Sequence, residues 1–376
     1  MYYNTIIKLL KIILVLFVLV NSCTEKYFPN IDSTAGLLVV DGRITNDQTQ
    51  FEVNLYRSVE IESHDSLLFE TGAQIITHCD DGTSILMSEM SPGKYINMNP
   101  SFKGEVGKTY WIEITTKNGK IFESNPEIML SPISISNIYG EVDKIIIDKN
   151  ESTNAVKFYF DLQNPANDSD FYLWEYQASF EWHTISNIPK SENPAYICYP
   201  EERSNRVHIY NASNLEVKSL KHLQAAFITE HEVKLNYEYY FQVHAFTISE
   251  ECYKFWSNIK KVSQSNGTLF DVIPANVEGN IQCCNGDDQI LGYFQVSSHT
   301  QNADSFKADN YNIKFSQETI KCRTSQISSL EYDPKKHHII EVITLPKGEI
   351  AYKVKPNFCY DCSLKYSRTK PSFWVD

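Results

Sequence analysis

The sequence predicts an all-β protein with two tandem β-sandwich domains of the immunoglobulin and fibronectin type. Most of the chain consists of short segments in which apolar and polar residues alternate, and turn signals separate these segments at intervals of about 8–12 residues. Aromatic residues make up 13% of the chain, and its 23 tyrosines and 20 phenylalanines favour strands. A single stretch, residues 249–264, has the periodicity of a helix instead.

The first sandwich is expected over residues 36–130. Its segments alternate with period two, so that one face of each strand is apolar. Asp81-Gly82 and Asn118-Gly119 are dipeptides typical of tight hairpin turns. Residues 126–132 are bounded by prolines and are expected to link the two domains.

The second sandwich is expected over residues 133–376, and its cysteine-rich, disulfide-stapled C-terminal extension is expected to dock on it rather than to form a third domain. In the segment Phe171–Tyr176, Tyr172 and Trp174 share one face and Leu173 lies on the other. Apolar residues on both faces indicate a strand that is central or covered by another element. Residues 184–215 are polar and irregular, and we expect them to form a long insertion of the kind that often carries function.

The helix over residues 249–264 begins at a typical capping residue. Ser249 can cap the first turn, and Glu250 and Glu251 suit the positive end of the helix dipole. Apolar side chains follow at helical spacing, namely Cys252, Phe255, Trp256, Ile259 and Val262. We expect this face to pack on the sheet. Insertion into a membrane or binding of a partner helix are the alternatives.

The N-terminus predicts export and attachment to a membrane. Residues 12–20 are apolar and follow Lys8 and Lys11, which is the pattern of a signal peptide over residues 1–22. The ending Val20-Asn21-Ser22-Cys23 is similar to a bacterial lipobox, which implies cleavage before Cys23 and acylation of its thiol. Residues 23–35 would then be a lipidated tether. The alternative is an ordinary signal peptide that happens to be followed by cysteine.

The cysteines fit an exported protein. Besides Cys23, the chain contains Cys79, Cys198, Cys252, Cys283, Cys284, Cys322, Cys359 and Cys362. An oxidising compartment favours disulfides, and all of these except Cys79 are taken as disulfide candidates. A bond between Cys198 and Cys252 is one option. The Cys-x-x-Cys spacing of Cys359 and Cys362 also occurs in zinc ribbons, but the second such pair that a ribbon needs is missing.

Charge and motifs exclude several classes of function. The net charge is −13, and without residues 1–22 it is −15, with 32 basic against 47 acidic residues. Such a chain is unsuited to binding nucleic-acid phosphates. The sequence lacks the HExxH and Gly-x-Ser-x-Gly motifs. We therefore predict no catalytic residue, metal site or cofactor. A surface hydrolase of glycans or peptides stays open, since its two carboxylates can be distant in the chain.

Several short motifs of this chain resemble those of a family of Bacteroidota lipoproteins known as domain of unknown function 4249. They are the lipobox with Cys23, Leu37-Leu-Val-Val-Asp-Gly-Arg-Ile44, Pro92-Gly-Lys-Tyr95, Phe102-Lys-Gly-Glu-Val-Gly-Lys-Thr-Tyr110, Gly267-Thr-Leu-Phe-Asp271, Gly292-Tyr-Phe294, Cys359-Tyr-Asp-Cys362 and Lys370-Pro-Ser-Phe-Trp374. Members are typically encoded beside TonB-dependent receptors. The resemblance thus implies an outer-membrane lipoprotein, facing the cell exterior or the periplasm, that assists a TonB-dependent transporter in nutrient uptake. A structural subunit of an outer-membrane assembly or secretion complex is the alternative.

Two short motifs are similar to O-glycosylation sites of the same phylum. They are Asp32-Ser33-Thr34 and Asp65-Ser66-Leu67. Ser33 and Ser66 are therefore candidates for glycosylation.

Overall fold

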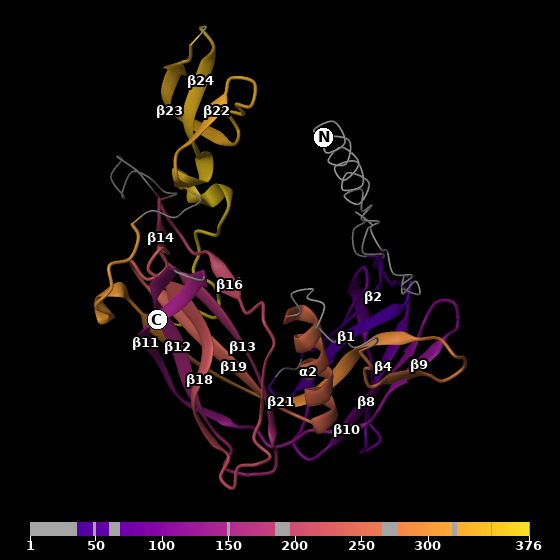
Figure 1. Cartoon of the computed structure of the whole chain (residues 1–376). Coiled ribbons are helices and arrows are strands. Elements are labelled where there is room, and N and C mark those ends of the chain that lie inside the picture. The colour runs from indigo at the N-terminus through magenta and orange to yellow at the C-terminus, as the bar shows by residue number, and fades with distance from the viewer. Residues whose placement is uncertain are drawn as a thin grey trace, which may run out of the picture.

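A computed structural model describes residues 36–47, 50–59, 68–148, 151–184, 196–264, 277–317, 322–346 and 348–375. Cys23, Ser33 and Ser66 lie outside these residues, so the predictions for them stay predictions. The described part consists mainly of strands arranged in several sheets, with one α-helix, which confirms the all-β prediction (Figure 1). No helix among the described residues has the length and apolarity needed to cross a membrane.

The first sandwich is formed by two sheets that face one another. One contains β1 (Leu38–Thr45), β2 (Glu52–Arg57), β3 (Leu68–Phe69), β6 (Ser88–Ser91) and β7 (Lys94–Ile96). The other contains β4 (Gln74–Cys79), β5 (Ser84–Leu86), β8 (Thr109–Thr115), β9 (Ile121–Ser124), β10 (Glu127–Ile128) and β20 (Ile281–Cys283). The alternating apolar residues of both sheets, among them Leu38, Val53 and Ile112, form its core. Gly82 and Gly119 have φ values of 85° and 82°, which suits glycine in the predicted turns.

The second sandwich has its own core. One sheet contains β11 (Ser134–Asp148), β12 (Glu151–Gln163) and β18 (Ser219–Thr229). The facing sheet contains β13 (Phe171–Phe180), β16 (Glu201–Arg203), β17 (His208–Asn211), β19 (Tyr239–Ile248) and β21 (Ile290–Phe306). Tyr172 and Trp174 point into the core between these sheets, with Phe158 and Phe241. The prediction that Tyr172 and Trp174 share one apolar face of this strand is therefore confirmed.

Strand β21 corrects the expected domain boundary, because it belongs to both sandwiches. Residues 290–297 pair in parallel with β1 of the first sandwich, and residues 298–306 pair antiparallel with β19 of the second. The two sandwiches thus share one ten-stranded sheet. The assignment of residues 133–376 to the second domain was wrong for β20 and the first half of β21. Alternation in the sequence reveals a strand but not its pairing partner.

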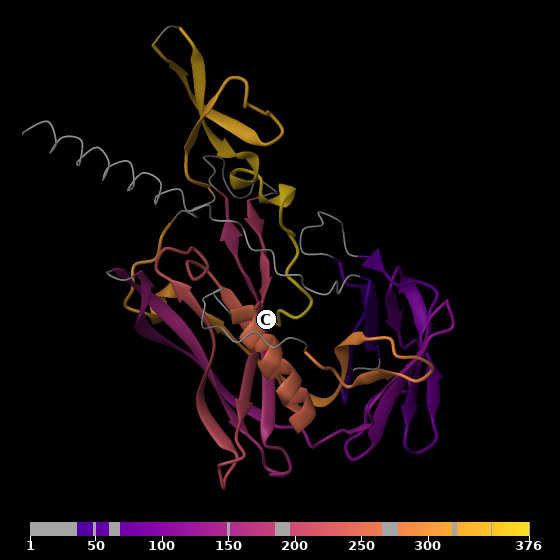
Figure 2. The same cartoon turned by 45° about the vertical axis from the view of Figure 1, so that its right-hand side comes forward.

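Helix α2 (Glu250–Gln264) packs on the outer face of this shared sheet. It lies in the angle between the two sandwiches (Figure 2). Cys252 and Phe255 contact Leu173 of β13 and Tyr293 of β21, so the helix covers the second apolar face that β13 was predicted to have. Ser249 caps the helix as predicted, since its Oγ accepts from the Cys252 N–H at 3.0 Å.

The predicted insertion over residues 184–215 contains three short strands in its described part. Residues 201–203 and 208–211 form β16 and β17 and pair with the edge of β13, while β15 (Ile197–Cys198) pairs with β14 (Trp182–His183). The expectation of an irregular segment was wrong here. Three prolines and a polar composition concealed strands that are too short to show alternation.

The C-terminal extension carries a sheet of its own. The extension contains a three-stranded sheet that projects from the second sandwich (Figure 1). Its strands are β22 (Ser325–Ser328), β23 (His337–Thr344) and β24 (Ile350–Pro356). Short 3-10 turns follow at Asn357–Cys359 and Cys362–Leu364, and another lies at Ala308–Asn310. The last residues return to the second sandwich, where Trp374 stacks on Tyr240. The cysteine-bearing part of the extension from Phe358 to Trp374 thus lies against the second sandwich, as expected, whereas β22–β24 project from it.

Candidate functional site

The candidate site is a cavity of about 610 Å³ on the outer face of the shared sheet. We call it the seam pocket, because side chains of both sandwiches line it. Its floor includes Arg43, Glu175, His244 and His299, and its walls are the segment Arg203–His208 and Trp256 of α2.

Period-two alternation explains the polar floor. In β13 and β19 one set of side chains fills the core of the second sandwich, and the alternate set, including Glu175 and His244, faces outward. These two residues are paired across the strands. Arg43 lies between buried residues of β1 and faces outward for the same reason. The polar residues of four neighbouring strands are thus brought onto one surface.

The segment Arg203–His208 forms a wall of the pocket because two separate short strands pair with the edge of β13. β16 pairs with residues 177–179 and β17 with residues 171–174, so the intervening segment 204–207 departs from the sheet. Two hydrogen bonds hold Ser204, the first residue of this segment, against Tyr176 of β13. The Ser204 N–H donates to the Tyr176 carbonyl at 2.9 Å, and the Ser204 Oγ accepts from the Tyr176 N–H at 3.2 Å. This break in the edge opens the pocket above Glu175.

Arg43 and Glu175 form an ion pair on the floor, with Nη2 2.8 Å from Oε1. The guanidinium of Arg43 also lies 4.3 Å from the centroid of the Phe246 ring, a cation–π contact. Burial alone would raise the pKa of Glu175, but the attraction of Arg43 outweighs it and lowers that pKa below the ordinary value. The Glu175 carboxylate is therefore negatively charged at neutral pH, and the positive charge of Arg43 compensates it.

Two histidines of the floor, His244 and His299, are linked in a chain to Asp47. Asp47 contacts Nδ1 of His299, and Nε2 of His299 lies 2.9 Å from Nδ1 of His244. Burial, together with repulsion from His299, lowers the pKa of His244 to about 4, so this imidazole is neutral at pH 7. Of Nε2 of His299 and Nδ1 of His244, one nitrogen donates this hydrogen bond and the other accepts it.

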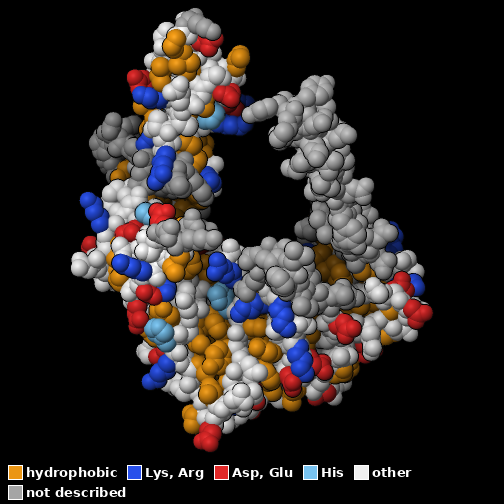
Figure 3. Space-filling view, viewed as in Figure 1, with side chains coloured by type: hydrophobic (Ala, Val, Ile, Leu, Met, Phe, Trp, Pro, Cys, Tyr) orange, Lys and Arg blue, Asp and Glu red, His pale blue; other side chains and the backbone are white. Residues whose placement is uncertain are grey.

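Cations surround the mouth of the pocket. Arg203 and Arg206 are exposed, and neither has an ion-pair partner among the residues that the structure describes. Burial, followed by repulsion from Lys260 and Arg206, lowers the pKa of His208 to about 4. Lys and Arg side chains gather on the face around α2 (Figure 3). The surroundings of the pocket are therefore positive in a chain of net charge −13.

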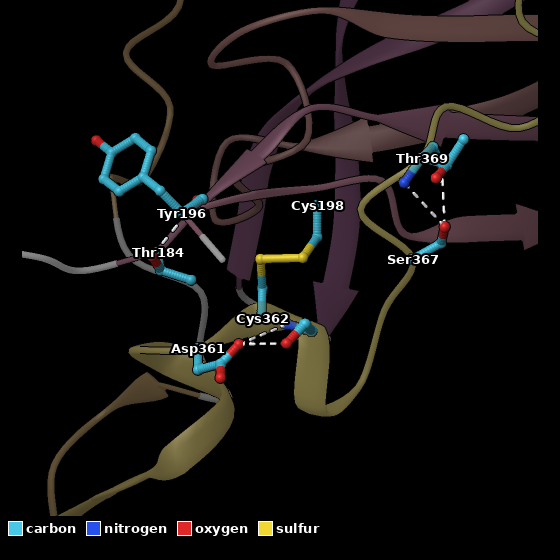
Figure 4. The surroundings of a disulfide bond; sticks show 8 residues. Thr184, Tyr196, Cys198, Asp361, Cys362, Ser367 and Thr369 are labelled. Atoms are coloured by element: carbon cyan, nitrogen blue, oxygen red, sulfur yellow. Dashed lines mark hydrogen bonds between the residues drawn. A yellow bond between two sulfur atoms is a disulfide. The ribbon is translucent and has the colours of Figure 1, made fainter. Parts of the chain in front are cut away.

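Four of the seven disulfide candidates are paired. Cys198 bonds to Cys362 (Figure 4), and Cys322 bonds to Cys359. The proposed pairing of Cys198 with Cys252 was wrong, because Cys252 is buried under α2 against the outer face of the shared sheet. The two cysteines of the Cys-x-x-Cys motif bond to different partners, which removes both thiolates from a zinc site.

The other four cysteines among the described residues, including Cys252, are free thiols. Cys79 is buried in the core of the first sandwich, Cys283 is half-buried, and Cys284 is exposed. Within the described ranges, no group of three or more His, Cys, Asp or Glu side chains is placed to hold a metal ion.

Sequence reasoning did not find the seam pocket. Its residues come from four distant segments, with 132 positions between Arg43 and Glu175 and 55 between His244 and His299. One signal was present, namely polar residues such as His244 on the outward face of an otherwise apolar strand. The segment 201–208 also falls inside the insertion for which a functional role was expected.

The arrangement is suited to binding. Glu175 is the one carboxylate among the described residues that line the pocket, and it is already paired with Arg43. Glycoside hydrolysis of the usual kind needs two carboxylates on either side of the bond. The pocket offers cations, amides, neutral imidazoles and an indole instead.

Comparison with known proteins places the chain in a family. No curated protein matches it. The family model described as "Domain of unknown function (DUF4249)" matches residues 24–303, which include every described residue that lines the seam pocket. The projecting sheet β22–β24 lies beyond the match. Because the match covers most of the chain, this protein belongs to the DUF4249 family.

Proposed function

We propose that this protein is a lipid-anchored, non-enzymatic binding subunit of the outer membrane that assists a TonB-dependent transporter in nutrient capture. The seam pocket is the observation that carries the binding role. It lies between two sandwiches that share a sheet, and polar, charged and aromatic groups line it. Pockets of this size and composition are typical of small-molecule sites. Acylation of Cys23 would hold the body at the membrane.

The pocket supports a binding role over hydrolysis. Its carboxylate is engaged by Arg43, and His244 has a depressed pKa of about 4 that makes it a weak base. These groups are arranged to hold polar atoms rather than to exchange protons with a substrate.

The projecting sheet β22–β24 supports a protein partner. Apolar side chains at its surface are largely exposed, at 96% for Leu330, 46% for Ile340 and 58% for Val342. β22 and β23 are its two edge strands. Exposed edges and apolar patches mark surfaces that other chains bind, through strand addition or apolar contact. We assign the transporter contact to this surface.

Affinity purification of the native full-length protein from solubilised outer membranes tests the proposal. We expect a TonB-dependent receptor barrel to co-purify. The variant Ile340→Lys/Val342→Lys should lose the barrel, because it places charge on the contact surface. The matched control Val217→Lys, at a residue 74% exposed on the second sandwich, should keep it. Recovery of the protein alone would overturn the proposal, and recovery of assembly or secretion factors would favour a structural subunit instead.

A further inference from the structure

We propose that the seam pocket binds a sugar-sized organic anion and that Arg203 and Arg206 hold its carboxylate, sulfate or phosphate group. This inference deepens the proposed binding function and rests on it. It names the chemical class of the ligand, which neither the family match nor the sequence assigns.

The positive charge of the pocket is not balanced by carboxylates of the described residues. Arg43, the third arginine of the pocket, is neutralised by Glu175 at 2.8 Å. Arg203 and Arg206 have no such partner in the described part of the chain, and Lys260 of α2 lies close enough to perturb the neighbouring His208. Like charges gathered without counterions are unfavourable unless an anion joins them. The acidic remainder of the protein makes this local excess of cations more distinctive.

Arginine side chains are suited to holding an anionic group. A guanidinium offers donors in a planar fork that matches the oxygens of carboxylate, sulfate and phosphate groups. Arg203 and Arg206 stand on either side of the break at Ser204, where the segment leaves the edge of β13. Their placement on one short wall allows both to reach the same group at the pocket mouth.

The polar floor of the pocket is suited to the hydroxyl groups of a sugar. Gln177 donates to Gln242 at 2.5 Å on the shared sheet, and Gln177 also lines the pocket with Glu175 and His244. Amide, carboxylate and neutral imidazole groups together supply donors and acceptors, which suits hydroxyl groups. Trp256 adds an aromatic side chain at the wall. A cavity of about 610 Å³ accommodates a ligand of one or two sugar rings.

The test uses four compounds that share one ring. Glucuronate, glucose 6-phosphate and glucose 6-sulfate differ from glucose in the group at C6, so the series separates the carboxylate, phosphate and sulfate sources. Isothermal titration of the full-length protein in detergent should give at least one anion bound about 10-fold more tightly than glucose. That preference should decrease as salt rises from about 50 to about 500 mM, because the site is open to solvent.

A pair of double variants locates the site. Arg203→Gln/Arg206→Gln should weaken binding of the preferred anion by about 10-fold or more. Arg323→Gln/Arg368→Gln removes the same charge from exposed positions of the C-terminal extension and should leave binding unchanged. Equal binding of glucose and all three anions, or full affinity in the Arg203/Arg206 variant with an unchanged circular dichroism spectrum, would overturn the inference. If the protein co-purifies with a receptor barrel but shows no preference for an anion in this titration, the proposed transporter role stands and the proposed ligand class is wrong.

Discussion

Arg43 of the first sandwich and Glu175 of the second form an ion pair across the junction of the two sandwiches, with Nη2 2.8 Å from Oε1. The pair stands on neighbouring parts of one continuous sheet, because β21 joins β1 to β19 and β19 joins β13. It therefore couples the two sandwiches and sets the floor of the seam pocket at the same time.

Replacing Arg43 by methionine should lower the free energy of unfolding by about 1–2 kcal/mol, because Glu175 loses its partner. The side chains are 29% and 42% exposed, so solvent screening keeps the effect below that of a fully buried pair. Chemical denaturation of Arg43→Met, Glu175→Gln and the double variant measures the coupling. We expect the double variant to cost about 1 kcal/mol less than the two single costs combined. Strictly additive costs would contradict the pairing.

Stability should depend on pH through Glu127. This carboxyl is buried where β10 meets α2 and β21, and it accepts hydrogen bonds from the Tyr293 and Ser249 hydroxyls. Burial raises its pKa from 4.5 to about 7. Between these two pKa values the folded protein binds more protons than the unfolded chain. The contribution of Glu127 to stability is therefore fully present below pH 4.5 and is lost as the pH rises toward 7.

The variant Glu127→Gln isolates this contribution. The wild-type protein should lose up to about 3 kcal/mol from Glu127 across the window, whereas the glutamine variant should lose none of it. Urea denaturation at a series of pH values gives the two slopes. Glu278→Gln, at an exposed position, is the control and should keep the wild-type slope. Parallel curves for wild type and Glu127→Gln would refute the assignment.

Gly292 is required by the close pairing of β21 with β1. Its φ is 100°, and an added Cβ would lie 1.8 Å from the Val40 carbonyl oxygen. Gly292→Ala should therefore cost about 3 kcal/mol or more, from strain and from forced separation of the strands. Gly82→Ala is the control, since Gly82 has a φ of 85° but no atom within 4 Å of the added Cβ. It should cost about 1 kcal/mol. Equal melting temperatures for the two variants would show that β21 is not packed as described.

The Cys198–Cys362 disulfide joins residues 164 positions apart and fixes the C-terminal extension to the second sandwich (Figure 4). Cys198→Ser/Cys362→Ser should reduce stability by about 2–4 kcal/mol. It should also speed proteolytic release of the extension. Limited proteolysis under non-reducing conditions checks this, with the free-thiol variant Cys283→Ser/Cys284→Ser expected to match the wild type. An unchanged digestion pattern in the first variant would contradict a structural role for the bond.

Local features could be predicted from the sequence because they depend on neighbouring residues. The alternation in β13, the turn at Asp81-Gly82 and the cap at Ser249 are each encoded within a few positions. The helix matches its expected range to within one residue. Long-range pairing could not be predicted this way. Nothing in the alternation of Leu291–Val296 indicates that this strand returns to β1.

The candidate site was hidden for the same reason. Arg43, Glu175 and His244 meet only after β21 has joined the two sandwiches. The disulfides show a similar limit, because eight cysteines permit 105 pairings and the sequence does not choose among them. Only the fold brings Cys198 to Cys362.

The proposed function depends most directly on the anchor at Cys23, and intact-mass spectrometry of the native protein tests it. We predict a polypeptide that begins at Cys23 and carries the additional mass of acyl chains. We also predict that Cys23→Ser moves the protein from the membrane fraction to the soluble fraction. An unmodified thiol at Cys23, or membrane association that survives the serine substitution, would contradict the account.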